Sequence, residues 1–115
     1  MSIKRHGVGN RLSQAVVHGD TVYLAGIVPD YASLDAKGQT EQILTKIDGL
    51  LKAVGSDKSK LLAAQIFVSD MRVFGAMNEA WDAWVSQGNT PSRATVEARL
   101  ANPKFMVEIM VTAAI

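Results

Sequence analysis

The chain contains no cysteine among its 115 residues. Disulfide bonds, zinc sites built on thiolates and a cysteine nucleophile are therefore excluded. The sequence also lacks any apolar run near the roughly 20 residues that a membrane-spanning helix needs. Its first residues, Met1 to Gly7, contain no apolar signal core. We therefore expect a cytoplasmic protein without a membrane partner.

An excess of charge of one sign is also missing. Twelve lysines and arginines are balanced by eleven aspartates and glutamates, and the resulting net charge of +1 is not gathered into a basic cluster. Proteins that bind nucleic acid usually concentrate basic residues on one face, so we expect no nucleic-acid partner. Hydrophobic residues make up 48% of the chain. This length and composition predict a single domain over residues 1–115.

The order of apolar patterns predicts six strands and two helices. The strand candidates are β-prone runs at residues 3–6, 13–18, 21–28, 61–68, 94–100 and 105–115. The first helix is predicted by an apolar stripe that ends before Gly55, formed by Ile43, Ile47, Leu50, Leu51 and Val54. The second helix is predicted to take Asp70 as its N-cap and to end at Gly88. Its stripe consists of Met71, Phe74, Met77, Asn78, Trp81, Trp84 and Val85.

These elements predict an α+β fold in which a mixed six-stranded sheet carries both helices on one face. Residues 61–68 are apolar on both sides, so we expect this strand to be central and covered on both faces. Within residues 105–115, Val107, Ile109 and Val111 should face one way and Glu108 the other. Two helices cannot cover both faces of such a sheet, and the sequence therefore predicts an oligomer with closed symmetry.

Two charged residues stand beside runs that otherwise read as buried strands. Arg93 follows Pro91 where a strand starts, and Glu108 is the one charge in residues 105–115. A carboxylate in an apolar strand is costly unless it is paired or faces a cavity. An arginine presents a rigid fork of donors that fits a carboxylate. We therefore expect Arg93 and Glu108 to meet at one small pocket.

Each of these residues also has a purely structural interpretation. Arg93 could bind a ligand carboxylate, or it could form an internal ion pair or be solvated. Glu108 could orient a water molecule, or it could close a salt bridge. Asn78 could donate to a backbone carbonyl or contact a ligand, whereas Trp81 is interpreted as a core or interface anchor. The two histidines have no metal-ligand spacing, so no metal site is predicted.

Several motifs resemble the Rid family, also called YjgF. Pro91-Ser92-Arg93 and Val107-Glu108-Ile109 carry the resemblance, together with Val22-Tyr23-Leu24-Ala25-Gly26 and Phe67-Val68-Ser69-Asp70-Met71, and it covers nearly the whole chain. Within that family, Gly55–Lys60, Met77–Val85 and Asn102–Lys104 are most similar to the YoaB-like branch.

The resemblance implies a fold like that of the Bacillus type of chorismate mutase. It implies a homotrimer with three clefts between subunits, each lined by Arg93 and Glu108. The implied activity is hydrolytic deamination of reactive 2-iminoacids to 2-oxoacids and ammonia, without a metal or organic cofactor. In this reading Arg93 holds the substrate carboxylate, Glu108 positions the attacking water, and main-chain groups near Thr95 and Gly26 contact the substrate.

The chain departs from the family pattern at three positions. Leu12 stands where the archetype has a tyrosine, Ala25 where it has a serine, and Thr95 where it has a cysteine. The first two changes remove polar groups from the expected pocket, while Arg93 keeps the carboxylate anchor. The alternative to the deaminase is therefore a non-catalytic trimeric binding module for small 2-oxoacids or related carboxylates. RNA cleavage ranks last, because a chain without a basic cluster attracts phosphate weakly.

Overall fold

The computed structural model describes all 115 residues, Met1–Ile115. Its elements are β1 (Ile3–Val8), β2 (Ser13–His18), β3 (Thr21–Leu24), α1 (Ala36–Ala53), the 3₁₀ turn η1 (Lys58–Lys60), β4 (Leu61–Val68), the 3₁₀ turn η2 (Met71–Val73), α2 (Phe74–Trp84), β5 (Ser92–Glu97) and β6 (Val107–Ala114). The predicted order of six strands and two helices is confirmed. None of the helices is long and apolar enough to cross a bilayer.

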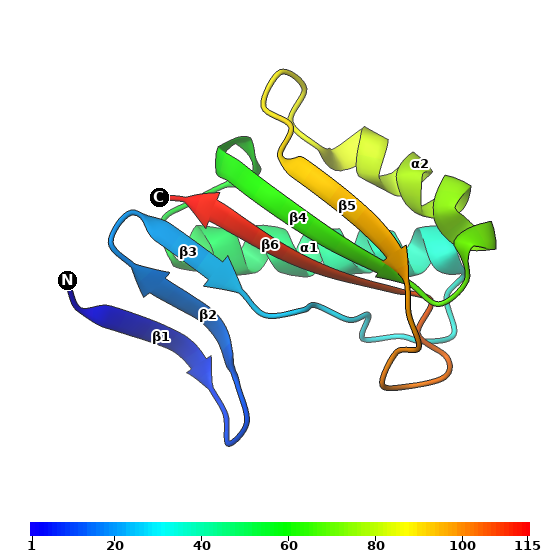
Figure 1. Ribbon diagram of the computed structural model, residues 1–115, viewed down its shortest axis with the longest axis horizontal. Coiled ribbons are helices and arrows are strands. Elements are labelled where there is room, and N and C mark those ends of the chain that lie inside the picture. The colour runs from blue at the N-terminus through cyan, green and yellow to red at the C-terminus, as the bar shows by residue number, and fades with distance from the viewer.

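The six strands form one mixed sheet in the order β1-β2-β3-β6-β4-β5. All neighbouring pairs are antiparallel except β4 and β5, which are parallel and are joined through α2. Figure 1 shows α1 behind the central strands and α2 alongside β5. The predicted α+β architecture is therefore confirmed, and β5 is an edge strand that lies close to the second helix.

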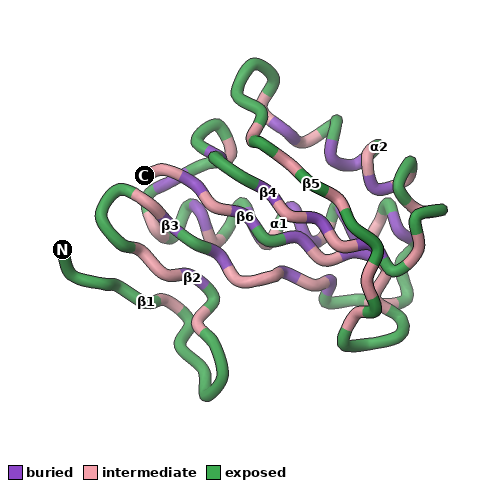
Figure 2. The backbone as a smooth tube through the Cα atoms, in the orientation of Figure 1, coloured by how far each residue is buried: buried purple, intermediate pink, exposed green.

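The core lies between the central strands and α1. Val107, Ile109 and Val111 of β6 are buried with Ile43 and Ile47 of α1, and Figure 2 shows this alternation of buried and exposed segments along the central strands. Burying each of these side chains stabilises the fold by about 1.5–3 kcal/mol. The predicted facing of the last strand is confirmed, since Glu108 lies outside this core.

The opposite face of the sheet is not covered within the chain. Tyr23, Val96 and Met110 remain 50%, 44% and 43% exposed, and their strands pair in the register that puts them on one side. The prediction that β4 is covered on both faces is wrong for the single chain. Ile66 is buried, but Phe67 is only half-buried, because both helices pack on the same side of the sheet.

The first helix ends as predicted, whereas the second differs at both ends. Gly55 has φ +83°, and its N–H donates to the Lys52 carbonyl, so it closes α1 as the expected C′ residue. Asp70 caps the turn η2 instead of α2. The second helix ends at Trp84 instead of Gly88, because Val85 adopts extended backbone angles and its side chain is buried in the core.

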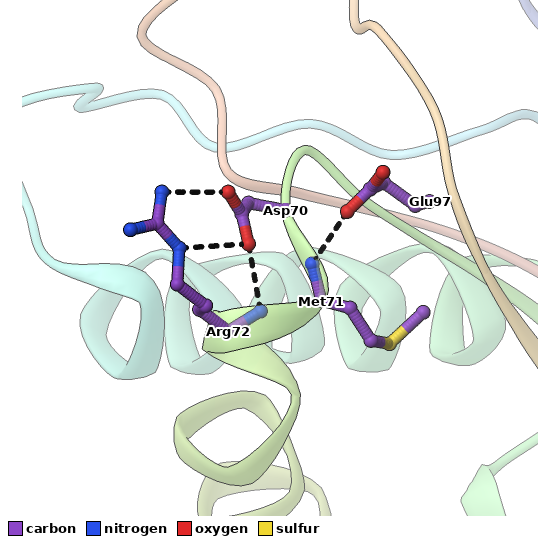
Figure 3. Close-up of polar contacts among 4 residues, drawn as sticks. All are labelled: Asp70, Met71, Arg72 and Glu97. Atoms are coloured by element: carbon purple, nitrogen blue, oxygen red, sulfur yellow. Dashed lines mark hydrogen bonds and ion pairs between the residues drawn. The ribbon is translucent and has the colours of Figure 1, made fainter.

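The turn η2 before α2 is tied to the end of β5 by one carboxylate and capped locally by another (Figure 3). Asp70 accepts a hydrogen bond from the backbone N–H of Arg72 at 2.8 Å and two from the Arg72 guanidinium, at 3.1 Å from Nε and 2.8 Å from Nη2. Glu97 accepts one from the backbone N–H of Met71 at 2.8 Å. The side-chain and then the backbone hydrogen bonds of Arg72 lower the pKa of Asp70 to about 2.

The lowered pKa of Asp70 predicts a pH-dependent stability. A folded-state pKa of about 2 lies below the ordinary value of 3.8, so the stabilisation is present above pH 3.8 and is lost as the pH falls toward 2. Asp70→Asn should therefore lower the melting temperature at pH 7, and the difference from wild type should disappear near pH 2. Thermal unfolding followed by circular dichroism between pH 2 and 7 measures this.

The control is Asp82→Asn, which replaces an exposed carboxylate on α2. It should show no comparable change with pH. A gap between Asp70→Asn and wild type that stays constant down to pH 2 would contradict the assignment.

Candidate functional site

Arg93 lies on the helix-facing side of β5 and is held by α2. It pairs in register with the buried Ala64 of β4. Its Nη1 donates to Oδ1 of Asn78 at 2.8 Å. The guanidinium carbon lies 5.4 Å from the ring centroid of Trp81 and 5.9 Å from that of Phe74. Asn78 thus contacts Arg93 instead of a backbone carbonyl, and two aromatic faces stabilise the charge.

One edge of the Arg93 guanidinium remains free of protein partners. Nη1 is used by Asn78, whereas Nε and Nη2 make no hydrogen bond within the chain, and the three ion pairs of the structure involve other residues. The same Nε–Nη2 edge of Arg72 binds the Asp70 carboxylate at two points (Figure 3). The free edge of Arg93 therefore has the geometry for a two-point contact with a carboxylate, like the contact that Arg72 makes with Asp70.

The support of Arg93 follows from the spacing along α2. Phe74, Asn78 and Trp81 are separated by four and three residues, which places them on one face of the helix. The β4–α2–β5 crossover lays that face over β5. The sequence predicted Trp81 to be a core or interface anchor, and it lies in the core at 5% exposure. Sequence reasoning did not connect Phe74 and Trp81 with Arg93, although their spacing around Asn78 was the available signal.

Glu108 lies on the opposite face of the sheet. It pairs with Phe67 of β4, and Phe67 pairs with Val96 of β5. Because successive strand residues alternate between faces, Phe67 and Ala64 point to opposite sides, and so do Glu108 and Arg93. A single chain therefore does not bring Arg93 and Glu108 to one pocket. They can share a pocket only between two copies of the chain.

Gly26 lets the Glu108 side chain lie against the backbone that follows β3. Ile27 and Ile109 exchange two backbone hydrogen bonds, at 2.8 and 3.0 Å. Leu24 and Ile27 are both buried, so Ala25 and Gly26 between them form a bulge on the open face. A Cβ at Gly26 would overlap Oε2 of Glu108 and lie 3.1 Å from its Cδ. The predicted close approach at Gly26 is confirmed.

The remaining predicted residues join one or the other side. Thr95 follows Arg93 on the same face of β5, and its Oγ1 is the one buried side-chain polar atom without a hydrogen-bond partner. Ala25 donates its N–H to the carbonyl of Gln14 at 2.9 Å. Leu12 lies two residues from Gln14 and is exposed.

Two sets of candidate residues result, one on each face of the sheet. The arginine group consists of Arg93, Thr95 and Asn78, and the glutamate group consists of Glu108, Gly26, Ala25 and Leu12.

Neither group lines a hollow of the single chain. The largest hollow, about 760 Å³, lies at the connection between β5 and β6, where Ser69, Arg99 and Phe105 contribute to its wall. No cluster of three or more histidine, aspartate or glutamate side chains is arranged to hold a metal ion. The Glu108 carboxylate takes part in no ion pair. Each group thus contains one charge without an ion-pair partner in the chain, the guanidinium of Arg93 and the carboxylate of Glu108.

Comparison with known proteins gives consistent matches over the whole chain. The family model described as Endoribonuclease L-PSP matches residues 3–115. The RutC family protein YoaB of Escherichia coli K12 is 47% identical over 115 residues, which is all of both chains. The Reactive Intermediate Deaminase A of Arabidopsis thaliana, a chloroplastic protein, is 31% identical over 108 residues, covering 87% of this chain and 57% of the plant protein.

A solved structure shows the same fold. The crystal structure of a YjgF family member from Neisseria meningitidis superposes with a TM-score of 0.97 at 45% identity, covering 99% of this chain and 95% of that one.

The contact between Gly26 and Glu108 predicts a coupled pair. Gly26→Ala should destabilise the fold by about 0.5–1.5 kcal/mol, since the added Cβ overlaps the end of the flexible Glu108 side chain and forces it away from its preferred rotamer. In a Glu108→Ala background the overlap is absent, and most of that cost should disappear. Denaturant unfolding of the two single variants and the double variant measures the coupling.

The matched control is Gly49→Ala within α1, where an added Cβ meets nothing within 4 Å. This change should raise stability by up to about 1 kcal/mol through helix propensity. Equal costs of Gly26→Ala with and without the Glu108 side chain would argue against the contact.

Proposed function

This chain belongs to the Rid/YjgF family, and we propose that it hydrolyses 2-iminoacids to 2-oxoacids and ammonia. The observation that carries the proposal is the Nε–Nη2 edge of Arg93, which has no protein partner and suits a carboxylate. The name of the plant relative, a reactive intermediate deaminase, supports the reaction class. The cytoplasmic location expected from the sequence stays a prediction.

We propose that the active sites lie in clefts between the copies of a homotrimer. Arg93 and Glu108 are on opposite faces of one sheet, so a shared cleft takes the arginine group from one copy and the glutamate group from its neighbour. The exposed apolar side chains of Tyr23, Val96 and Met110 support burial of the open face in such an assembly. The helices then lie on the outside of the trimer.

In the proposed reaction, Arg93 binds the carboxylate of the protonated imine at two points. Main-chain groups near Thr95 and Gly26 contact the rest of the substrate. Glu108 accepts a proton from water while the water oxygen forms a bond to C2, and the electron pair of the C=N bond moves to nitrogen. Glu108 then returns the proton to nitrogen, the C–N bond breaks with its electron pair leaving on ammonia, and the hydroxyl proton passes to that ammonia, which gives the 2-oxoacid and ammonium.

This chemistry makes modest demands on the protein. A protonated imine is already electrophilic, so orientation of the substrate and of one water molecule supplies much of the acceleration. A carboxylate acting as general base contributes about 100- to 10,000-fold. Glu108, which forms no ion pair within its own chain, is suited to this role once a neighbouring copy covers it.

A second candidate function is a trimeric binding module that holds 2-oxoacids or related carboxylates without turnover. The observation that favours it is the composition of the glutamate group. Leu12 and Ala25 carry no side-chain hydrogen-bond donor, so this group offers the substrate imine fewer polar contacts. The two functions share the arginine group and differ in whether Glu108 acts on water.

Replacement of the two charged residues separates these functions. Glu108→Gln should lower imine hydrolysis by about 100-fold or more and leave carboxylate binding largely intact. Arg93→Ala should weaken binding by about tenfold or more through loss of a charge-assisted contact. The substrates are 2-iminobutanoate and 2-iminopropanoate generated in situ by a dehydratase, with semicarbazide competing for the imine.

Glu79→Gln and Lys52→Ala, both at exposed helix positions, serve as controls. If wild type does not accelerate release of the 2-oxoacid, the deaminase proposal fails for these substrates. If 2-oxoacids still bind in an Arg93-dependent way, the binding module takes its place.

The proposed homotrimer predicts that sedimentation equilibrium at micromolar concentration gives three times the chain mass of 12.4 kDa.

The composite cleft predicts that two inactive variants restore each other. When Arg93→Ala and Glu108→Gln chains are unfolded together at equal amounts and refolded, random mixing should leave about a quarter of the clefts with both wild-type residues. Imine hydrolysis should recover to about a quarter of the wild-type rate.

Each variant refolded alone is the control and should stay inactive. A monomeric mass, or a mixture no more active than its components, would rule out clefts shared between copies.

A further inference from the structure

Two aromatic rings flank Arg93, but only one of them is accessible to a bound molecule. Trp81 is 5% exposed and belongs to the core, whereas Phe74, the first residue of α2, is 36% exposed. The ring of Phe74 lies 5.9 Å from the guanidinium carbon of Arg93. A ligand held by Arg93 therefore has an exposed aromatic surface beside its anchor.

The geometry of a two-point carboxylate contact brings a ligand close to that ring. The carboxylate oxygens lie about 2.7–2.9 Å from the guanidinium nitrogens in such pairs. C2 of the ligand and its substituents therefore lie within a few bond lengths of the guanidinium. We infer that Phe74 is a specificity-determining residue that favours 2-imino and 2-oxo acids with an apolar side chain extending beyond C3. This inference rests on the proposed function of Arg93 as the carboxylate anchor.

The glutamate group supports the same preference independently. Phe67 lies beside Glu108 on the open face and Val96 lies beyond Phe67, and Leu12 and Ala25 add no polar side-chain atom. Neither group contains a second cationic residue that could pair with a carboxylate in the side chain of a ligand. The charge of Glu108 would also repel a second carboxylate. Monocarboxylates with branched apolar side chains therefore fit better than dicarboxylates.

Trp81 provides a binding signal that does not depend on turnover. The chain has two tryptophans, and Trp84 donates its indole N–H to Asp48 on α1, outside both groups. In Trp84→Phe protein, Trp81 is the single tryptophan, and its ring lies 5.4 Å from the Arg93 guanidinium. Binding of an anion to Arg93 should change its fluorescence.

The test titrates full-length Trp84→Phe protein with three stable acids: 2-oxopropanoate, 4-methyl-2-oxopentanoate and 2-oxopentanedioate. The branched acid should bind about tenfold more tightly than 2-oxopropanoate, because its extra carbons reach an apolar surface. The dicarboxylate should bind most weakly. In a Phe74→Ala background, the tenfold preference should fall below about threefold, while loss of the Phe74 ring beside the Arg93 guanidinium should weaken binding of both acids by a similar factor.

Phe74→Leu keeps an apolar side chain at this position and should keep most of the preference. Tyr31→Ala removes an exposed aromatic residue in the connection before α1 and should leave the preference unchanged. Circular dichroism and sedimentation show whether each variant is folded and assembled.

The outcomes separate this inference from the proposed function. If folded Phe74→Ala protein keeps the tenfold preference, or if Trp84→Phe protein with Phe74 intact binds all three acids equally, the role of Phe74 is refuted while Arg93 remains the anchor. If none of the acids binds, or if binding survives Arg93→Ala, the proposed function fails as well, because the carboxylate anchor is then wrong.

Discussion

The single layer of helices on the sheet decides where every candidate residue lies. Side chains of a strand alternate between its two faces, and here α1 and α2 cover only one of them. Arg93 falls on the covered face and Glu108 on the open face. The chain therefore carries one group with an unpaired charge on each face, and the open face keeps exposed apolar side chains.

Helix α2 connects the stability of the fold with the candidate chemistry. Its buried residues Met77 and Trp81 belong to the core, while Asn78 orients the guanidinium of Arg93. The turn before α2 is tied to β5 through Glu97 and capped by Asp70 (Figure 3). The free edge of the Arg93 guanidinium thus rests on a regular helix and strand, which hold a side chain more accurately than a loop does.

Much of the architecture was predictable from local patterns. The order of the elements, the alternation within β6 and the end of α1 at Gly55 each depend on neighbours in the sequence. The close approach at Gly26 was indicated by a glycine within a strand pattern, although its partner, Glu108, lies far along the chain. Local patterns were less informative where tertiary packing intervenes. Asp70 has the residue type of a helix cap but caps η2, and the second helix ends early because Val85 is buried.

The sequence by itself determined which residue types are available: an arginine and a glutamate beside apolar strands, no thiol, and motifs that resemble one family. Only the tertiary structure decided that Arg93 and Glu108 face opposite ways and that Phe74 flanks the anchor. The physical reason is the register of β4 with β5 and β6. A period of two tells which residues of one strand share a face, but the relation between faces of different strands depends on pairing between segments far apart in the chain.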